Sequence, residues 1–274
     1  MMELKKYEKN VTSQWGEDGV IEEIFNRLGE GNKLCCEFGA WDGKHLSNCW
    51  DLWHNKDWTA VLIEGEDDRV DNLKVSLADF KKVKPVLRFI EPEGVNSVDQ
   101  ILDDEGIKDR LDLLSIDIDS DDYAVFQHLK RTPRLIVIEY NPTIPPHIDL
   151  VQKKGENLGN SISSIFKLAQ TKGYKFIHLT YTNMFLIHES EFDKLNLPEL
   201  DYFRVFPYDK LTCVINTYGG DTLLSQPMPY AKWLEPADVG MRKYLGRKYL
   251  GKDKPSFPSF DSDGDIQHIK IINK

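Results

Sequence analysis

Two apolar segments of the sequence each end in an acidic residue that a glycine follows closely. The first runs into Glu37-Phe38-Gly39-Ala40-Trp41-Asp42-Gly43 and the second into Glu64-Gly65. Gly39 lets a ligand approach the backbone because no Cβ stands in the way, and Gly43 eases the start of a helix. Glu37 can pair with a cationic group such as an ammonium, and Glu64 can accept hydrogen bonds from both hydroxyls of a ribose. The pattern predicts a site for a ligand that carries both groups.

A dinucleotide fits this turn less well than a cationic ligand does. A pyrophosphate favours the pattern Gly-x-Gly-x-x-Gly and a helix N-terminus without carboxylates, whereas Glu37 and Asp42 would repel it. The alternative interpretation is that Glu37 and Glu64 are ordinary carboxylates at strand ends, where solvent is near.

A second group of polar side chains follows two later apolar segments, and its members are Asp117, Asp119, Asp121, Asp122, Glu139 and Asn141. If these segments are adjacent parallel strands, both sets reach the same rim of the sheet. Oxygen ligands of this kind suit Mg²⁺, so Asp117, Glu139 and Asn141 are candidate metal ligands. A simpler interpretation is also open, in which Asp121 and Asp122 begin a helix and Asp117 contacts only a cofactor or the backbone.

His147 lies in the irregular segment Pro142-Thr-Ile-Pro-Pro-His147, above the predicted site. An unperturbed histidine has a pKa of about 6.5, which suits a general base. A solvated loop histidine is the alternative.

These residues need a sheet to position them. From Lys33 to about Ile187, short apolar runs alternate with helical patterns, as successive βαβ units do. The expected strands are 33–38, 59–64, 85–90, 112–117, 134–139, 174–180 and 183–188. The expected helices are 16–28, 43–55, 67–80, 95–105, 121–130 and 160–172. Only a short turn joins the last two strands, so they must be antiparallel neighbours at the end of a mostly parallel α/β sheet.

Four segments, in this order, resemble the FkbM-type family of S-adenosylmethionine (SAM) dependent methyltransferases: Glu-Phe-Gly-Ala-Trp-Asp-Gly, Leu-Ile-Glu-Gly, Leu-Ser-Ile-Asp-Ile-Asp and Ile-Glu-Tyr-Asn. The resemblance covers roughly residues 13 to 188. It implies a Rossmann-like class I methyltransferase sheet, mostly parallel with an antiparallel terminal hairpin. It also implies SAM as the cofactor, held by Glu37, Gly39, Ala40, Gly43, Glu64 and Asp117.

The upstream segment Ser13-Gln-Trp-Gly-Glu-Asp-Gly19 resembles the part of such enzymes that folds over the cofactor. This resemblance implies that Gln14 touches SAM. The segment also has the pattern of a helix start, with Ser13 as N-cap and Glu17 and Asp18 in the first turn, and both interpretations can hold together.

The function that the resemblance implies is O-methylation of a small hydroxylated metabolite, such as a sugar, a nucleotide sugar or a natural-product precursor. The candidate catalytic residues are Asp117, Asp119 and His147. Metal-dependent O-methyltransferases place acidic and amide ligands after the same two strands, so Mg²⁺ is a candidate second cofactor that would orient the acceptor hydroxyl. Two alternatives stay open. One is N-methylation of a small amine, because Glu139-Tyr-Asn-Pro142 has a slight likeness to Asn-Pro-Pro-Tyr, and the other is a non-catalytic SAM-binding scaffold protein.

Composition limits the choice of partners. The chain has 274 residues and a formal charge of −10, which argues against capture of nucleic acid through its phosphates. No apolar run approaches the roughly 20 residues that cross a bilayer, and the N-terminus has no signal-peptide pattern. With four cysteines that lack metal-ligand spacing, we expect a cytoplasmic protein with reduced thiols.

The periodic pattern weakens after about residue 200. We therefore expect a methyltransferase domain at 1–222, with its core at 33–188, and a C-terminal extension at 223–274 that is rich in Pro, Gly, Lys and aromatic residues. The extension is a candidate lid or contact of a homo-oligomer.

Overall fold

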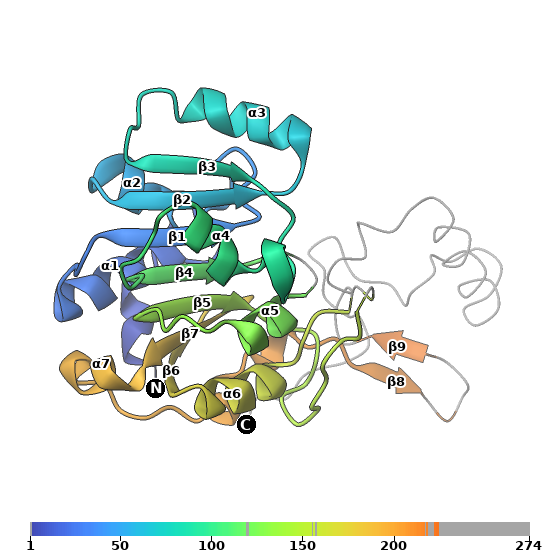
Figure 1. Ribbon diagram of the computed structural model, residues 1–274. Coiled ribbons are helices and arrows are strands. Elements are labelled where there is room, and N and C mark those ends of the chain that lie inside the picture. Colours follow the sequence, from blue (N-terminus) through green and yellow to red (C-terminus); the bar gives the residue numbers. More distant parts are fainter. Residues whose placement is uncertain are drawn as a thin grey trace. The chain divides into compact units, whose positions relative to one another are not determined.

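Seven strands form one sheet in the order β3-β2-β1-β4-β5-β7-β6 (Figure 1). Their bounds are β1 Leu34–Phe38, β2 Thr59–Glu64, β3 Val83–Leu87, β4 Leu113–Ile116, β5 Leu135–Glu139, β6 Tyr174–Leu179 and β7 Asn183–His188. Strands β1 to β5 are parallel, and β7 is antiparallel to both of its neighbours. The predicted fold class, a mostly parallel α/β sheet that ends in an antiparallel hairpin, is confirmed.

The computed structural model describes residues 2–118, 121–154, 156, 158–216, 218 and 222–224. The chain divides into two compact units, Met1–Phe206 and Pro207–Lys274. In the second unit the described elements are η3 Tyr208–Lys210 and the antiparallel pair β8 Val214–Asn216 and β9 Thr222–Leu224. The boundary expected at 222/223 falls inside this unit, and the extension that defined it lies almost entirely outside the described residues, so that boundary stays a prediction.

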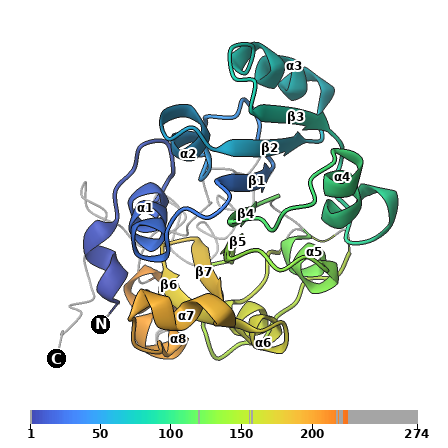
Figure 2. The same cartoon turned by 60° about the vertical axis from the view of Figure 1, so that its left-hand side comes forward.

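Helices cover both faces of the sheet (Figure 2). The helices of the first unit are η1 Glu3–Tyr7, α1 Glu17–Leu28, α2 Trp50–Asn55, α3 Asp67–Ser76, η2 Gly94–Asn96, α4 Val98–Asp104, α5 Asp122–His128, α6 Ile162–Thr171, α7 Glu189–Leu195 and α8 Tyr202–Val205. Figure 2 shows α1 and α2 on one face and α4 and α5 on the other. No helix of the described part of the chain is long and apolar enough to span a membrane.

Burial on two faces explains why the strands read as continuous apolar runs rather than alternating ones. All five residues of β1 are buried. Helix α1 places Val20, Ile21, Ile24 and Phe25 in the core, at the spacing of one helical face. Burial also raises the pKa of the Cys36 thiol, and the cysteines among the described residues are free of disulfides.

Two predicted elements were placed wrongly. The helix expected at 43–55 is only the short α2, because residues 42–49 form a loop held by the Asp42 and Ser47 side chains. The third strand is 83–87 rather than 85–90. Pro85 inside it is tolerated because β3 is an edge strand, where a missing N–H costs no ladder bond. Sequence analysis missed η1, α7 and α8.

The topology defines one edge of the sheet, called here the carboxyl edge, where β1 to β5 end. Because β6 runs parallel to β5, the turn 180–182 and the start of β7 also lie at this edge, and Glu139 pairs with Asn183 across the β5–β7 ladder. The strand order reverses between β1 and β4. In open α/β sheets, ligands bind outside the carboxyl ends at such a reversal.

Candidate functional site

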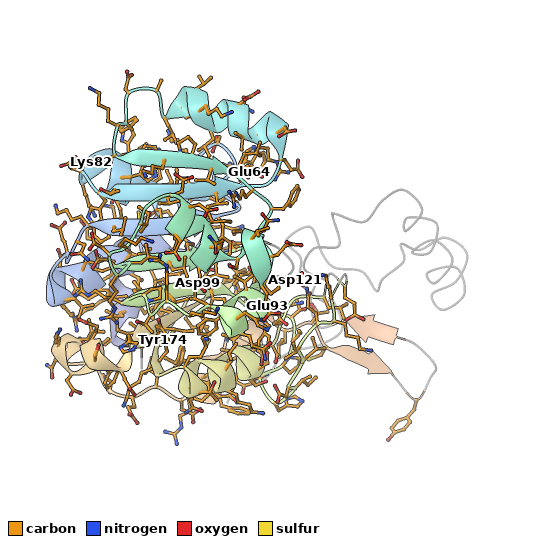
Figure 3. All side chains as sticks on the ribbon, viewed as in Figure 1. Glu64, Lys82, Glu93, Asp99, Asp121 and Tyr174 are labelled. Carbon is orange, nitrogen blue, oxygen red and sulfur yellow. The ribbon has the colours of Figure 1, made fainter. Side chains whose placement is uncertain are left out.

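The backbones that leave β1 and β4 approach each other closely at the carboxyl edge. Gly39 has a φ of +72°, and a Cβ built on it would lie 2.3 Å from the carbonyl oxygen of Asp117. No side chain fits at this distance, so glycine is required here for the packing of two loops as well as for its backbone conformation. Figure 3 shows Glu64 and Asp121 toward this edge and Lys82 away from it.

Glu64, the last residue of β2, is 4% exposed and collects backbone amides around its carboxylate. Its Oε1 accepts hydrogen bonds from Gly65 N at 2.9 Å and Glu66 N at 3.0 Å, and its Oε2 accepts one from Trp41 N at 2.8 Å. A carboxylate has about four acceptor positions, so capacity remains on Oε2. The ribose-binding role stays a prediction, and the position at the strand end agrees with it.

Glu37, the fourth residue of β1, is 5% exposed. Its Oε2 accepts a hydrogen bond from Ser47 Oγ at 2.5 Å, and its Oε1 accepts one from Asn48 N at 2.7 Å. Burial raises the pKa of Glu37 to about 7, against the effect of these two bonds, and the charge of Asp18 raises it further. Glu37 therefore holds the loop before α2, and its predicted contact with an ammonium group stays untested.

The loop after β1 is strongly curved. Ala40 is 3% exposed and donates its N–H to Ile63 O, while Trp41 has a φ of +48° and is 43% exposed. The Arg69 guanidinium lies 4.9 Å from the Trp41 ring centre. Gly43 has a φ of +80° and donates its N–H to Ala40 O, so it closes a turn. The prediction that a helix begins at Gly43 is wrong. The cofactor contacts of Ala40 and Gly43 stay predictions.

The segment before α1 folds around the carboxylate of Asp18. Its Oδ2 accepts hydrogen bonds from the N–H groups of Val11, Thr12 and Ser13, at 2.7, 2.9 and 2.8 Å. Its Oδ1 is buried and has no hydrogen-bond partner among the described residues. The N-cap of α1 is Gly16 rather than Ser13, although Ser13 Oγ does accept the Asp18 N–H.

The same segment is fixed to the carboxyl edge at two further points. Glu17 is fully buried, and its Oε1 accepts hydrogen bonds from Thr180 Oγ1 at 2.6 Å and Asn183 Nδ2 at 3.1 Å. Thr12 Oγ1 donates to Ser47 O at 3.1 Å. Gln14 is exposed on this anchored segment, and its contact with SAM stays a prediction.

The β5 side of the edge is held together by Asn141. Its Nδ2 donates to Leu158 O at 2.7 Å, and its Oδ1 accepts from both the N–H and the hydroxyl of Thr143. Both ends of the amide are thus engaged in loop structure, which disfavours the amine-binding role that N-methylation would require of it.

The metal site finds no support in the structure. Asp117 and Glu139 are half-buried at the ends of β4 and β5, and Asp119 lies outside the described residues. Residues 2–118 and the other described segments hold no group of three or more His, Cys, Asp or Glu side chains able to bind a metal. The amide oxygen of Asn141, the third predicted ligand, already accepts two hydrogen bonds from Thr143. Asp122 accepts the Ile118 N–H at 2.9 Å and begins α5, as its structural interpretation predicted.

His147 is exposed in a turn of the loop that follows β5. Its role as a base stays a prediction. Sequence analysis missed three buried polar residues at this edge. They are Asp18, which binds the N–H groups of residues 11–13, and the loop residues Ser47 and Asn48. Asp18 was interpreted only as a first-turn acid, and nothing in the sequence marks a loop that wraps around it.

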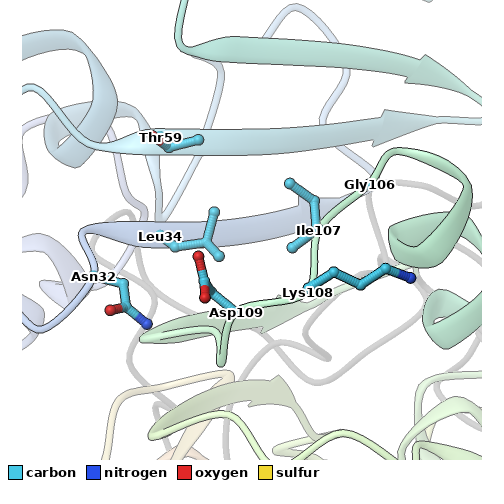
Figure 4. A pocket seen from close by; sticks show the side chains of 7 residues that line it. All are labelled: Asn32, Leu34, Thr59, Gly106, Ile107, Lys108 and Asp109. Atoms are coloured by element: carbon cyan, nitrogen blue, oxygen red, sulfur yellow. The ribbon is translucent and has the colours of Figure 1, made fainter.

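A small cavity of about 150 Å³ lies at the opposite edge, where β1 and β2 begin; it is lined by Asn32, Leu34, Thr59, Gly106, Ile107, Lys108 and Asp109 (Figure 4). Sites for small molecules usually enclose about 300–1,000 Å³. The cavity is thus too small for a nucleoside cofactor, and the carboxyl edge remains the candidate site.

The sheet order and the antiparallel β7 define a Rossmann-like α/β fold. No protein-family model matches the chain, and no curated protein matches its sequence.

Solved structures with a similar fold include the N-terminal domain of EvdMO1 with S-adenosylhomocysteine (SAH) bound, at 11% identity and a TM-score of 0.42, covering 62% of this chain and 79% of that one. The CMeT domain of the citrinin polyketide synthase is similar at 11% identity and a TM-score of 0.45, covering 64% and 52%. M. capricolum TrmK in complex with SAH is similar at 11% identity and a TM-score of 0.37, covering 61% and 67%. A likeness at this level extends no further than the fold, and no activity follows from it.

Proposed function

We propose that this protein is a SAM-dependent O-methyltransferase that acts on a small hydroxylated metabolite. The observation that carries the proposal is the pair of buried carboxylates, Glu37 and Glu64, at the ends of the adjacent strands β1 and β2, beside the strand reversal. The resemblance of the sequence to the FkbM-type family supports the same function, and membership of that family stays a prediction.

The loop after β1 favours SAM over a dinucleotide for a second reason. Dinucleotide sites place the pyrophosphate on a helix that begins directly after the first strand. Here β1 ends at Phe38 and α2 begins only at Trp50. The loop between them donates hydrogen bonds to the buried carboxylate of Glu37, and the buried carboxylate of Asp18 is close enough to act on Glu37. An acidic setting without a helix N-terminus suits a ligand with a sulfonium and an ammonium group.

The chain's own residues would divide the work as follows. Glu64 would accept a hydrogen bond from a ribose hydroxyl, and the segment 11–16, anchored through Glu17 and Thr12, would cover the ligand and limit the access of water. SAM supplies an activated methyl group to an acceptor oxygen. Asp117, Glu139 and His147 are the candidates to receive the proton of the acceptor hydroxyl, since they belong to the segments that leave β4 and β5.

The acceptor class is suggested by aromatic rings at the β7 side of the edge. Trp15 is 41% exposed and packs edge-on against Tyr181 of the β6–β7 turn, with ring centres 4.9 Å apart. A half-exposed indole suits the apolar C–H face of a sugar ring or the face of an aromatic ring. This agrees with a sugar, a nucleotide sugar or a natural-product precursor as the acceptor.

The cofactor is tested by calorimetric titration of the full chain with SAM, SAH and NAD. We expect SAM and SAH to bind and NAD not to bind. Glu64→Ala should weaken SAM binding more than tenfold, because hydrogen bonds to a charged group contribute about 1.5–3 kcal/mol. The matched control is Glu66→Ala, which removes an exposed carboxylate two residues away and should leave SAM affinity unchanged.

Binding of NAD, or of none of the three ligands, would contradict the proposal. An equal loss in Glu66→Ala and Glu64→Ala would show that the effect is a general change of charge or stability. If SAM binds as expected, slow SAM consumption with a panel of hydroxylated acceptors then tests the O-methylation step.

A further inference from the structure

Only one of the two oxygens of the buried Asp18 carboxylate has hydrogen-bond donors among the described residues. Its Oδ2 accepts three successive backbone amides, from Val11 to Ser13, an arrangement in which amides converge as they do on an anion. Its Oδ1 is buried, and no described residue donates to it. Buried polar atoms almost always have a partner, and an exception calls for a specific cause.

The three amides also fix the direction of the side chain. With Oδ2 bound on one side by residues 11–13, Asp18 cannot turn Oδ1 to solvent without breaking these bonds. The residue as a whole is 4% exposed. The unpartnered oxygen is therefore held in place, and its site favours a group that donates hydrogen bonds and carries positive charge.

Asp18 lies next to Glu37 through a short chain of contacts. Thr12, whose N–H binds Asp18, donates its hydroxyl to Ser47 O, and Ser47 Oγ donates to Glu37 Oε2. The charge of Asp18 is also near enough to raise the pKa of Glu37. Two like charges in a buried place repel each other, and a cation beside them would relieve the repulsion.

The two carboxylates differ in what they can still accept. Each oxygen of Glu37 already has a donor, from Ser47 or Asn48, whereas Oδ1 of Asp18 has none among the described residues. A divalent metal would need several more oxygen ligands than the two side chains give. An ammonium group needs only acceptors, and Asp18 has one held ready.

We propose that Asp18, rather than Glu37, is the principal partner of the ammonium group of the methionine part of SAM. This assignment rests on the proposed function. Glu37 then acts behind it, as a residue that positions the loop 47–49 and contributes a second, weaker acceptor.

The test compares SAH with its desamino analogue, in which hydrogen replaces the amino group, by calorimetry at pH 8. The measured quantity is the ratio of the two dissociation constants. In the wild type we expect a preference for SAH of about ten- to hundredfold, the range for a hydrogen bond to a charged group. Asp18→Asn should reduce the ratio to near one, and Glu37→Gln should leave it above about tenfold.

The matched control is Glu17→Gln, which changes a neighbouring buried carboxylate whose two oxygens both have donors. It should alter the affinities for SAH and the analogue equally and leave the ratio unchanged. Asp18→Asn should fold, because an amide oxygen can keep the three backbone bonds while a charge beside Glu37 is removed. Its unliganded thermal midpoint at pH 8 should equal or exceed that of the wild type.

The outcomes separate the assignment from the function on which it rests. A wild type that binds neither compound refutes both. A wild type that binds both equally, or an Asp18→Asn variant with the full ratio, refutes the assignment alone, as does loss of the ratio in Glu37→Gln.

A measurement on the wild type makes the test independent of any variant. Carbon NMR titration of Glu37 should give a lower pKa in the SAH complex than in the analogue complex, since the ammonium would offset the charge of Asp18. Equal pKa values in the two complexes would overturn the assignment.

Discussion

Replacement of Gly39 by alanine tests the close approach of β1 and β4 on which the candidate site depends. Gly39 has a φ of +72°, and the added Cβ would lie 2.3 Å from Asp117 O. The obstacle is a backbone carbonyl, which cannot rotate away as a side chain could. The substitution must therefore displace the loop after β1, the loop after β4, or both.

The expected loss in the free energy of unfolding has two parts. Alanine in the left-handed region costs about 1–2 kcal/mol, and forcing an extra carbon into a packed place costs about 1–3 kcal/mol. Gly106 supplies a matched control, because its φ is +73° and a Cβ there would meet nothing within 4 Å. Gly106→Ala should lose only the conformational part, about 1–2 kcal/mol, and Gly39→Ala about 2–5 kcal/mol.

Urea unfolding followed by circular dichroism measures both losses, and calorimetric titration with SAH measures the consequence for the site. Gly39→Ala should weaken SAH binding, whereas Gly106→Ala, near the start of β4, should not. Equal free energies of unfolding for the two variants would refute the 2.3 Å approach between Gly39 and Asp117. Normal SAH binding in a destabilised Gly39→Ala variant would refute the placement of the ligand at this edge.

Two further predictions concern buried charges. Because the pKa of Glu37 is raised from 4.5 to about 7, the folded state binds its proton more tightly than the unfolded state does. Wild-type stability relative to Glu37→Gln should therefore fall by about 3 kcal/mol between pH 4.5 and 7 and stay level above that, as measured by urea unfolding across pH. A constant difference would contradict the raised pKa. Arg134→Met should lower the free energy of unfolding by about 3–5 kcal/mol, because it leaves a buried carboxylate without its partner. Arg134 Nη1 lies 2.8 Å from the carboxylate of Asp112, whose side chain is 1% exposed. Lys194→Met, at a 58% exposed partner of Glu191, should cost under about 1 kcal/mol, and similar losses in the two variants would contradict the burial of Asp112.

The sheet could be predicted from sequence because its signals are local and strong. The apolar run at Leu34–Phe38 and the short link between β6 and β7 each exclude most alternatives without help from distant residues. The helix expected at 43–55 failed for the opposite reason. Asp42 and Ser47 side chains bind nearby N–H groups and replace helical bonds with turns, and this competition is not visible in a hydrophobic pattern.

The site could be predicted only in part. Glu37 and Glu64 were found because each stands at the end of a strand, where the rule for ligand placement in open sheets applies directly. Asp18 was not found as a site residue, because its importance depends on residues 11–13 folding back over it and on its nearness to Glu37, 19 positions along the chain. Contacts of this kind arise from tertiary structure and leave no periodic mark in the sequence.

The buried carboxylates at the edge follow one physical logic. Asp18, Glu37 and Glu64 each accept backbone amides from a loop, so each acid shapes a loop while it is kept out of water. Burial of three acids in one region would be costly if no cation were ever bound there. Without a cation, the repulsion is reduced because the pKa of Glu37 is raised to about 7, so that a large part of this group is neutral near pH 7. A cationic ligand would remove the need for this protonation, so ligand affinity should rise with pH as Glu37 loses its proton.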